Sequence, residues 1–160
     1  MKQYQSLLDE VSRQQARYDE KMQPPADATQ IAALQREARE KLAADVPEEY
    51  LDFLRQTNGL IWDNLIIYAS QQSPIANQEE SFIDGFVDAN LTARDVEECK
   101  DLLIFGSSGD VDLYVKRISS NQYQILDYTS LSVTKNVVNF NALITEALQI
   151  RLQPAEATAA

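Results

Sequence analysis

Residue types that commonly carry out catalysis are scarce in this chain of 160 residues, which contains no histidine and a single cysteine, Cys99. This composition excludes a serine–histidine or cysteine–histidine pair, an intramolecular disulfide, and a zinc site made of histidine and cysteine. The segment Gly106–Gly109 is not followed by the Gly-Lys-Ser/Thr of a phosphate-binding loop. We therefore expect Cys99 to be a small buried side chain, and we expect neither an enzyme nor a cofactor.

Carboxylates are the remaining candidates for chemistry. Asp110 and Asp112 are two residues apart at the start of a predicted strand, so their side chains could point to one face. Two such groups could begin a Ca²⁺ or Mg²⁺ site, but a calcium loop needs further oxygen ligands and a closing Glu. Leu-Tyr-Val follows here at 113–115. The simpler interpretation is that Asp110 shapes a turn and Asp112 is solvated at its rim.

Acidic residues are concentrated in the second part of the chain. Residues 1–45 carry seven Lys/Arg and eight Asp/Glu, whereas residues 46–160 carry seven Lys/Arg and seventeen Asp/Glu, a net charge of −10. Such a field repels the phosphates of nucleic acids and favours a basic partner. Solubility alone is the other explanation of this acidity.

The sequence contains no segment typical of a membrane or secreted protein. Its N-terminus lacks the apolar region and small-residue cleavage site of a signal peptide. No stretch approaches the roughly 18 consecutive apolar residues of a membrane span. Together with the single cysteine, which fits a reducing compartment, this predicts a cytoplasmic protein that contacts no membrane.

Helical periodicity dominates the first third of the chain. One helix is predicted over 3–22, with an apolar face that includes Tyr4 and Tyr18, and Pro24-Pro25 ends it. A second helix is predicted from Thr29, its N-cap, to about residue 44, and a third from Pro47 to Asn58-Gly59. The segment 24–28 is a candidate linker. Residues 1–44 are therefore interpreted as an N-terminal helical extension.

Short apolar runs separated by turn residues predict strands in the second part. Asp63-Asn64 interrupts the run 60–69 and indicates a hairpin or bulge, followed by a polar loop at 70–81 and a short strand or turn at 82–91. The remaining predictions are a loop or helical turn at 95–100, a strand at 102–105, a hairpin of 112–118 with 122–128, and a strand at 131–138. Asn139 is the expected N-cap of a final helix over 140–148, and 153–160 is a predicted flexible tail. This order predicts an α+β fold with a mostly antiparallel twisted sheet flanked by helices.

Two blocks of sequence resemble the SUKH superfamily. The first is Val-Pro-Glu-Glu-Tyr-Leu-Asp-Phe-Leu at 46–54, followed by Asn58-Gly59 and an apolar strand through Tyr68. The second is Phe105-Gly106 with Gly-Asp at 109–110 and Tyr-Val at 114–115. The resemblance covers about 45–150 and gives a SUKH-like domain over 45–152. Residues 1–44 lie outside it and resemble the extension of YrhA-type bacterial proteins.

The resemblance implies a protein-binding module with one twisted sheet and flanking helices. Bacterial members of the superfamily typically act as immunity proteins that neutralise polymorphic toxins, often nucleases or deaminases. A basic toxin domain is therefore the expected partner, because an acidic inhibitor associates rapidly with a basic active site. The candidate contact residues are Trp62, Asp63, Asp84, Asp88, Asp110 and Asp112.

Two alternatives stay open. Trp62 is the only tryptophan, and although Trp is enriched in binding hot spots, it could simply pack in the core. The chain could also be a non-catalytic scaffold of a housekeeping complex, or could self-associate as a homodimer through its N-terminal helix.

Overall fold

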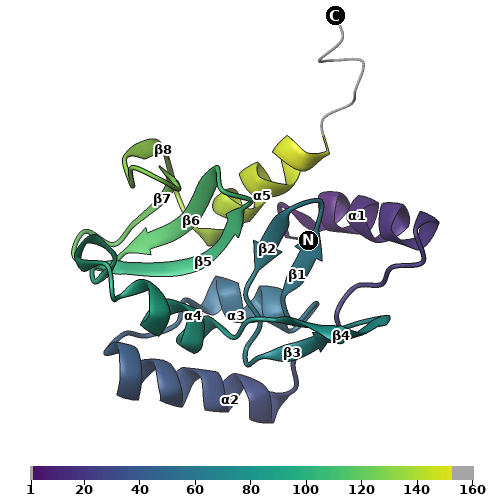
Figure 1. Cartoon of the computed structure of the whole chain (residues 1–160), viewed down its shortest axis with the longest axis horizontal. Helices are drawn as coiled ribbons and strands as arrows, with labels where there is room; N and C mark the ends of the chain where they lie inside the picture. Colours follow the sequence, from purple (N-terminus) through teal and green to yellow (C-terminus); the bar gives the residue numbers. More distant parts are fainter. Residues whose placement is uncertain (1, 153–160) are drawn as a thin grey trace, which may run out of the picture.

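A six-stranded antiparallel sheet forms the centre of the computed structural model, which describes residues 2–152 (Figure 1). Its strands lie in the order β1-β2-β5-β6-β7-β8, and β3 and β4 form a separate hairpin. The strands are β1 Leu60–Trp62, β2 Leu65–Ile67, β3 Ser73–Ile75, β4 Gln78–Ile83, β5 Leu102–Ser108, β6 Asp112–Arg117, β7 Gln122–Asp127 and β8 Val133–Val137. The predicted α+β class with a mostly antiparallel sheet is confirmed. The predicted tail at 153–160 lies outside the described residues.

Helices pack on the sheet and along its lower side in Figure 1. They are α1 Gln5–Arg17, α2 Ala28–Glu37, the π-helical turn Ala38–Leu42, α3 Glu48–Leu54, α4 Phe86–Ala93, the 3₁₀ turn Glu97–Cys99 and α5 Phe140–Arg151. None of the helices within residues 2–152 has the length and apolar character that crossing a bilayer requires.

The two faces of the sheet bury different sets of side chains, as strand alternation requires. Phe105, Tyr114 and Ile125 belong to the larger core, which also contains buried residues of α1, α2, α3 and α5. Ile104 and Leu113 belong to a smaller cluster on the other face. The N-terminal helices contribute to the larger core, since Tyr4, Leu8 and Val11 at α1 and Leu34 of α2 are buried in it.

Tyr50 of α3 is the centre of the larger core. Its ring centroid lies 5.2 Å from that of Phe86, 5.1 Å from Phe105 and 5.4 Å from Phe140. The Tyr50 hydroxyl donates to the carbonyl oxygen of Tyr68 at 2.6 Å. Burial raises the pKa of Tyr50 well above its ordinary value, so the phenol stays a proton donor. This residue therefore joins α3 to α4, β5, α5 and the end of β2.

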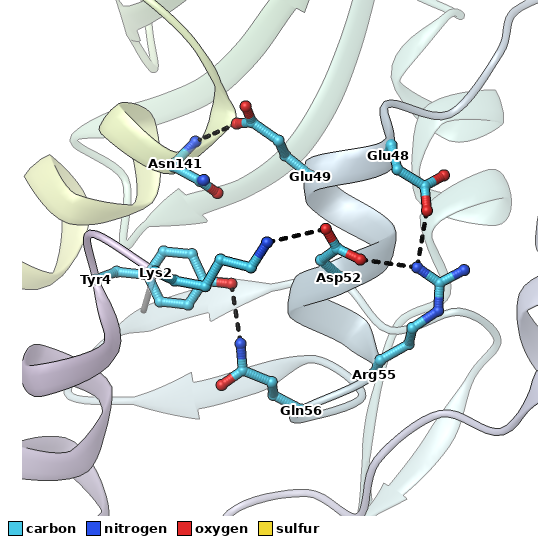
Figure 2. Close-up of polar contacts among 8 residues, drawn as sticks. All are labelled: Lys2, Tyr4, Glu48, Glu49, Asp52, Arg55, Gln56 and Asn141. Atoms are coloured by element: carbon cyan, nitrogen blue, oxygen red, sulfur yellow. Dashed lines mark hydrogen bonds and ion pairs between the residues drawn. The ribbon is translucent and has the colours of Figure 1, made fainter.

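The polar side of α3 connects the two ends of the described chain (Figure 2). The Glu49 carboxylate accepts from the backbone N–H of Asn141 at 2.8 Å, in the first turn of α5, where a negative charge complements the helix dipole. Asp52 accepts from Lys2 at 3.0 Å and from Arg55 at 2.9 Å. Glu49 and Asp52 of the first sequence block thus have structural roles in the fold.

The N-terminal helices differ from their predicted limits. The first helix ends at Arg17 instead of residue 22, because Asp19 takes a left-handed conformation with φ 58°. Tyr18 consequently leaves the apolar face and is 76% exposed. The second helix begins after Asp27, whose carboxylate accepts from the Gln30 N–H at 2.8 Å and forms a capping box, so Thr29 as N-cap is wrong. Its last turn is π-helical and ends at Leu42.

The predicted linker at 24–28 has no regular secondary structure up to Asp27, because α2 begins at Ala28, and it is held in place by hydrogen bonds. The backbone N–H of Ala26 donates to the Leu54 carbonyl oxygen at 2.8 Å, and the backbone N–H of Asn58 donates to the Pro24 carbonyl oxygen at 3.0 Å. The neighbouring Gln23 side chain donates to the Pro74 carbonyl oxygen at 3.0 Å. This segment therefore fixes the path of the chain between α1 and α2.

Two predictions in the middle of the chain are wrong. The segment 70–81 contains the β3–β4 hairpin and not a loop, with Asn77 at φ 64° in its turn. The sequence did not predict this hairpin, because its polar composition lacks the apolar alternation of a strand that buries one face. Residues 86–93 form the helix α4, after β4 has ended at Ile83. The third helix is shorter than predicted, because Pro47 is its N-cap and it ends at Leu54, before Asn58-Gly59. The Asp63-Asn64 turn, the β6–β7 hairpin and the Asn139 cap, whose side chain accepts from the Ala142 N–H, agree with the predictions.

Gly106 of the second sequence block lies where the backbone of β2 leaves no room for a side chain. A Cβ at this position would overlap the carbonyl oxygen of Ile66 and lie 3.0 Å from the Cα of Ile67. Both are backbone atoms of β2, which cannot move aside without leaving β5. The adjacent residue Phe105 accepts the Tyr68 N–H at 2.9 Å, so the close approach also places Tyr68.

Replacing Gly106 with alanine is expected to lower the free energy of unfolding by about 3 kcal/mol or more, because β2 must separate from β5. Gly109→Asn is the control, since Gly109 has φ 55° and open space around it, and asparagine tolerates this conformation. Urea denaturation of both variants measures the difference. Equal stability of the two would contradict the steric argument.

Asn90 of α4 holds the helix against β5. Its Nδ2 donates to the Ile104 carbonyl oxygen at 2.9 Å, and its Oδ1 accepts from the Ile104 N–H at 2.7 Å. The residues that β2 pairs with on β5 begin at Gly106. The amide side chain therefore continues the hydrogen bonding of β5 beyond the end of β2.

Asn90→Asp is expected to destabilise the fold by roughly 3 kcal/mol, because it buries a carboxylate and removes the donor to the Ile104 carbonyl. Asn136→Asp is the matched change on the exposed strand β8, where Gln124 can donate to either side chain. Chemical denaturation monitored by circular dichroism gives both values. Similar losses at the two sites would show that Asn90 has no special structural role.

Candidate functional site

The six residues predicted to contact a partner form two groups. Trp62 and Asp63 lie at the β1–β2 turn, and Asp110 and Asp112 lie at the β5–β6 turn. These two turns are adjacent, because the N–H of Gly109 donates to the Asn64 carbonyl oxygen at 2.8 Å. Asp84 and Asp88 are separate from them, just before α4 and in its first turn.

Trp62 is mainly a core residue. It is 8% exposed and belongs to the larger hydrophobic core. Its remaining surface lines a shallow hollow of about 400 Å³ together with Tyr18, Asp63 and Arg151. Asp63 and Asp110 are exposed in their turns, so the acidic side chains and not the tryptophan are presented to solvent at this end of the sheet.

Asp112 differs from its neighbour Asp110, because it is partly buried at the start of β6. Burial raises the pKa of the Asp112 carboxyl above its ordinary value, and the nearby Arg151 opposes this shift. Arg151 itself donates through Nε to the Ser108 hydroxyl at 3.2 Å. Within residues 2–152 no cluster of three or more acidic or cysteine side chains is arranged to hold a metal ion.

Asp84 and Asp88 border a hollow beside α4. Both are exposed, and they line about 230 Å³ together with Tyr68, Ala89 and Thr92. The last three residues also line a second hollow of about 370 Å³, so the two spaces adjoin. We call this combined depression the α4 groove. Its further lining residues are Ala93, Val96, Cys99, Ile104, Ser107, Leu113, Tyr128, Thr129 and Leu131.

The walls of the α4 groove are held by buried polar contacts. Asn90 fixes α4 to β5, and Arg94, directly after α4, donates to the Leu42 carbonyl oxygen at 3.0 Å. On the other side, the Tyr50 hydroxyl holds the backbone of Tyr68. Burial, with contributions from Asp84 and Tyr128, raises the pKa of Tyr68 to about 12. The Tyr68 hydroxyl therefore stays protonated at neutral pH and can donate.

The groove ends close to the first acidic group. The N–H of Tyr128 donates to the Val111 carbonyl oxygen at 2.9 Å. The turn that contains Tyr128 consequently lies beside the turn that contains Asp110. The α4 groove and the acidic end of the sheet are therefore neighbouring parts of the molecular surface.

Sequence reasoning identified the acidic residues of this region but missed its apolar ones. Val96 is 49% exposed and Tyr128 is 42% exposed, and both lie in segments where the sequence predicts a polar loop or a strand end. The lining residues come from several elements, including α4, β5, β6 and the 128–131 turn. No spacing of residues within one segment of the sequence therefore predicts the groove. The one feature of the sequence that could have indicated the groove is an apolar residue, Val96 or Tyr128, within an otherwise polar segment.

The positive charges of this part of the chain are engaged in contacts of their own. Lys100, Arg117 and Lys135 pair with Glu97, Asp101 and Glu146, and Arg55 pairs with Glu48 and Asp52. Lys116 lies 5.7 Å from the ring centroid of Tyr123. By contrast, none of the five candidate aspartates is in an ion pair within residues 2–152. Their charge is therefore not neutralised by an ion pair within these residues.

No known protein-family model and no curated protein matches this sequence, so the resemblance to SUKH domains stays a prediction.

Proposed function

We propose that this chain is an immunity-type protein-binding module that neutralises a basic toxin domain by occluding its active site. One observation carries the proposal: five candidate aspartates lack an ion-pair partner within residues 2–152, while the basic residues after position 46 are engaged elsewhere. Four of these carboxylates are exposed and that of Asp112 is partly buried, and carboxylates at a surface produce a negative field that steers a basic protein toward it.

A nuclease-type toxin is the partner class that best fits this field. Its active site must be basic to hold phosphates, and a rigid acidic surface can cover such a site without performing chemistry. The net charge of −10 over residues 46–160, from seven Lys/Arg and seventeen Asp/Glu, gives the same preference. The surface consists of short turns attached to a packed sheet, so little ordering is required on binding.

Self-association as a scaffold is the other proposal. A homodimer through α1 would use the outer side of this helix, because Tyr4, Leu8 and Val11 are buried in the chain's own core. Tyr18 is the apolar residue left exposed there. Light scattering at high concentration separates the proposals, since an immunity module needs no dimer.

Affinity capture with the tagged full chain, in cells of the organism that encodes it, tests the proposed function. We expect a protein with a basic domain whose expression alone arrests growth and whose co-expression with this chain restores growth. Capture of housekeeping proteins only, or a captured domain whose toxicity this chain leaves unchanged, would contradict the proposal.

Charge reversal at the acidic end of the sheet is expected to slow association with the captured domain. The double change Asp63→Lys and Asp110→Lys should lower the association rate about tenfold or more at low salt and flatten its dependence on salt. Stopped-flow or surface-based kinetics measures both quantities. Asp9→Lys with Glu40→Lys is the matched control, made at exposed positions on α1 and the π-helical turn. Equal effects of the two pairs would show that only total charge matters.

A further inference from the structure

We propose that the α4 groove binds an extended segment of a partner protein in which an apolar residue and an arginine are two positions apart. The apolar side chain enters the larger hollow, and the guanidinium lies at the mouth formed by Asp84 and Asp88. This deepens the proposed function by assigning a peptide chemistry to one part of the surface, and it rests on that function only for the identity of the partner.

The larger hollow suits an apolar side chain. Ile104, Leu113 and Leu131 line it, and Cys99 contributes a thiol whose pKa is raised by burial, which keeps it neutral. A volume of about 370 Å³ is at the lower end of the roughly 300–1,000 Å³ typical of ligand pockets. It accommodates a side chain or two and not a helix. Filling it removes apolar surface from water.

The smaller hollow suits a cation. Asp84 and Asp88 are both exposed there and have no ion-pair partner within residues 2–152. Of the groups that face them, Tyr68 is neutral at physiological pH, since burial first and then Asp84 and Tyr128 raise its pKa to about 12. Thr92 and Ala89 complete the lining and carry no charge. The mouth of the groove is therefore negative, with no ion pair to either carboxylate within residues 2–152.

Arginine fits this mouth better than lysine. A guanidinium presents planar donors that can serve two carboxylates, is weakly hydrated, and stacks on aromatic rings. The ring of Tyr68 lines both hollows and that of Tyr128 lines the larger one. An ammonium group would gain the charge interaction but little of the stacking.

The arrangement of the two hollows favours an extended occupant. They share Tyr68, Ala89 and Thr92 and so lie next to each other. In an extended chain, residues i and i+2 point to the same side and lie roughly 6–7 Å apart. One face of a short strand can therefore place an apolar side chain and an arginine in neighbouring hollows.

A blocked synthetic peptide tests the groove without the natural partner. The probe is acetyl-Ser-Leu-Ser-Arg-Ser-amide, titrated into the ¹⁵N-labelled full chain and followed by NMR. We expect saturable shifts at Ala89, Thr92 and Leu113. The same peptide with citrulline in place of arginine should have an affinity at least about fivefold lower, because citrulline keeps the shape of arginine and loses its charge. Shifts confined to other regions, or equal binding of both peptides, would overturn the proposal.

Three variants, one of them a control, locate the binding. Asp84→Asn with Asp88→Asn should weaken the arginine peptide about fivefold or more, whereas Asp9→Asn with Asp19→Asn, an equal loss of charge on the α1 side of the molecule, should leave it unchanged. Thr92→Trp fills the groove without changing charge and should abolish the shifts of both peptides, with an unchanged circular dichroism spectrum. Unaltered affinity in the first or third variant would overturn the assignment.

The same variants separate this inference from the proposed function. If the captured toxin domain binds the Asp84/Asp88 variant and the Thr92→Trp variant as tightly as it binds the native chain, the groove assignment fails and the immunity function stands. If the peptide binds in the groove and no toxin is found, the immunity function fails and the groove stands.

Discussion

The two hydrogen bonds between the buried side-chain amide of Asn90 and the backbone of Ile104 determine where the α4 groove forms on the sheet face that carries the smaller hydrophobic cluster. Strand β2 pairs with β5 only from Gly106 onward, and a bare strand edge buried beyond that point would leave Ile104 unsatisfied. Asn90 supplies both the missing donor and the missing acceptor. Because this amide belongs to α4, the helix lies close against β5, and the space left between them and the 128–131 turn is the α4 groove.

The larger core supports this arrangement from the opposite face. Tyr50 joins α3 to α4, β5 and α5 through ring contacts, and its hydroxyl holds the backbone of Tyr68, whose side chain borders the groove. Charges follow the same division. Glu48, Glu49 and Asp52 of α3 are used within the fold (Figure 2). The aspartates around the groove and the neighbouring turns form no ion pair in the described part of the chain. Acidic side chains therefore stabilise the fold at α3, and those around the groove are the ones to which we assign partner binding.

The sequence predicted those features that depend on a few adjacent residues. The Asp63-Asn64 turn and the Asn139 cap are local, and both are present. The end of the first helix was missed because it depends on the left-handed Asp19 and on contacts that hold the following segment to α3 and β3. Residue types alone left two roles open for Trp62, an interface contact or core packing, and tertiary packing places most of its side chain in the core. The α4 groove could not be predicted, since its lining comes from several segments that are far apart in the sequence.

Hydrogen–deuterium exchange of the complex with the captured partner tests the central claim most directly, namely that the acidic face around the α4 groove is the binding surface. The account predicts slower exchange on binding in residues 84–93 and 126–132, with α1 at Gln5–Arg17 unchanged. These segments report the groove walls and the turn next to Asp110. Protection confined to α1 or to β8, with the groove walls exchanging as in the free protein, would contradict it.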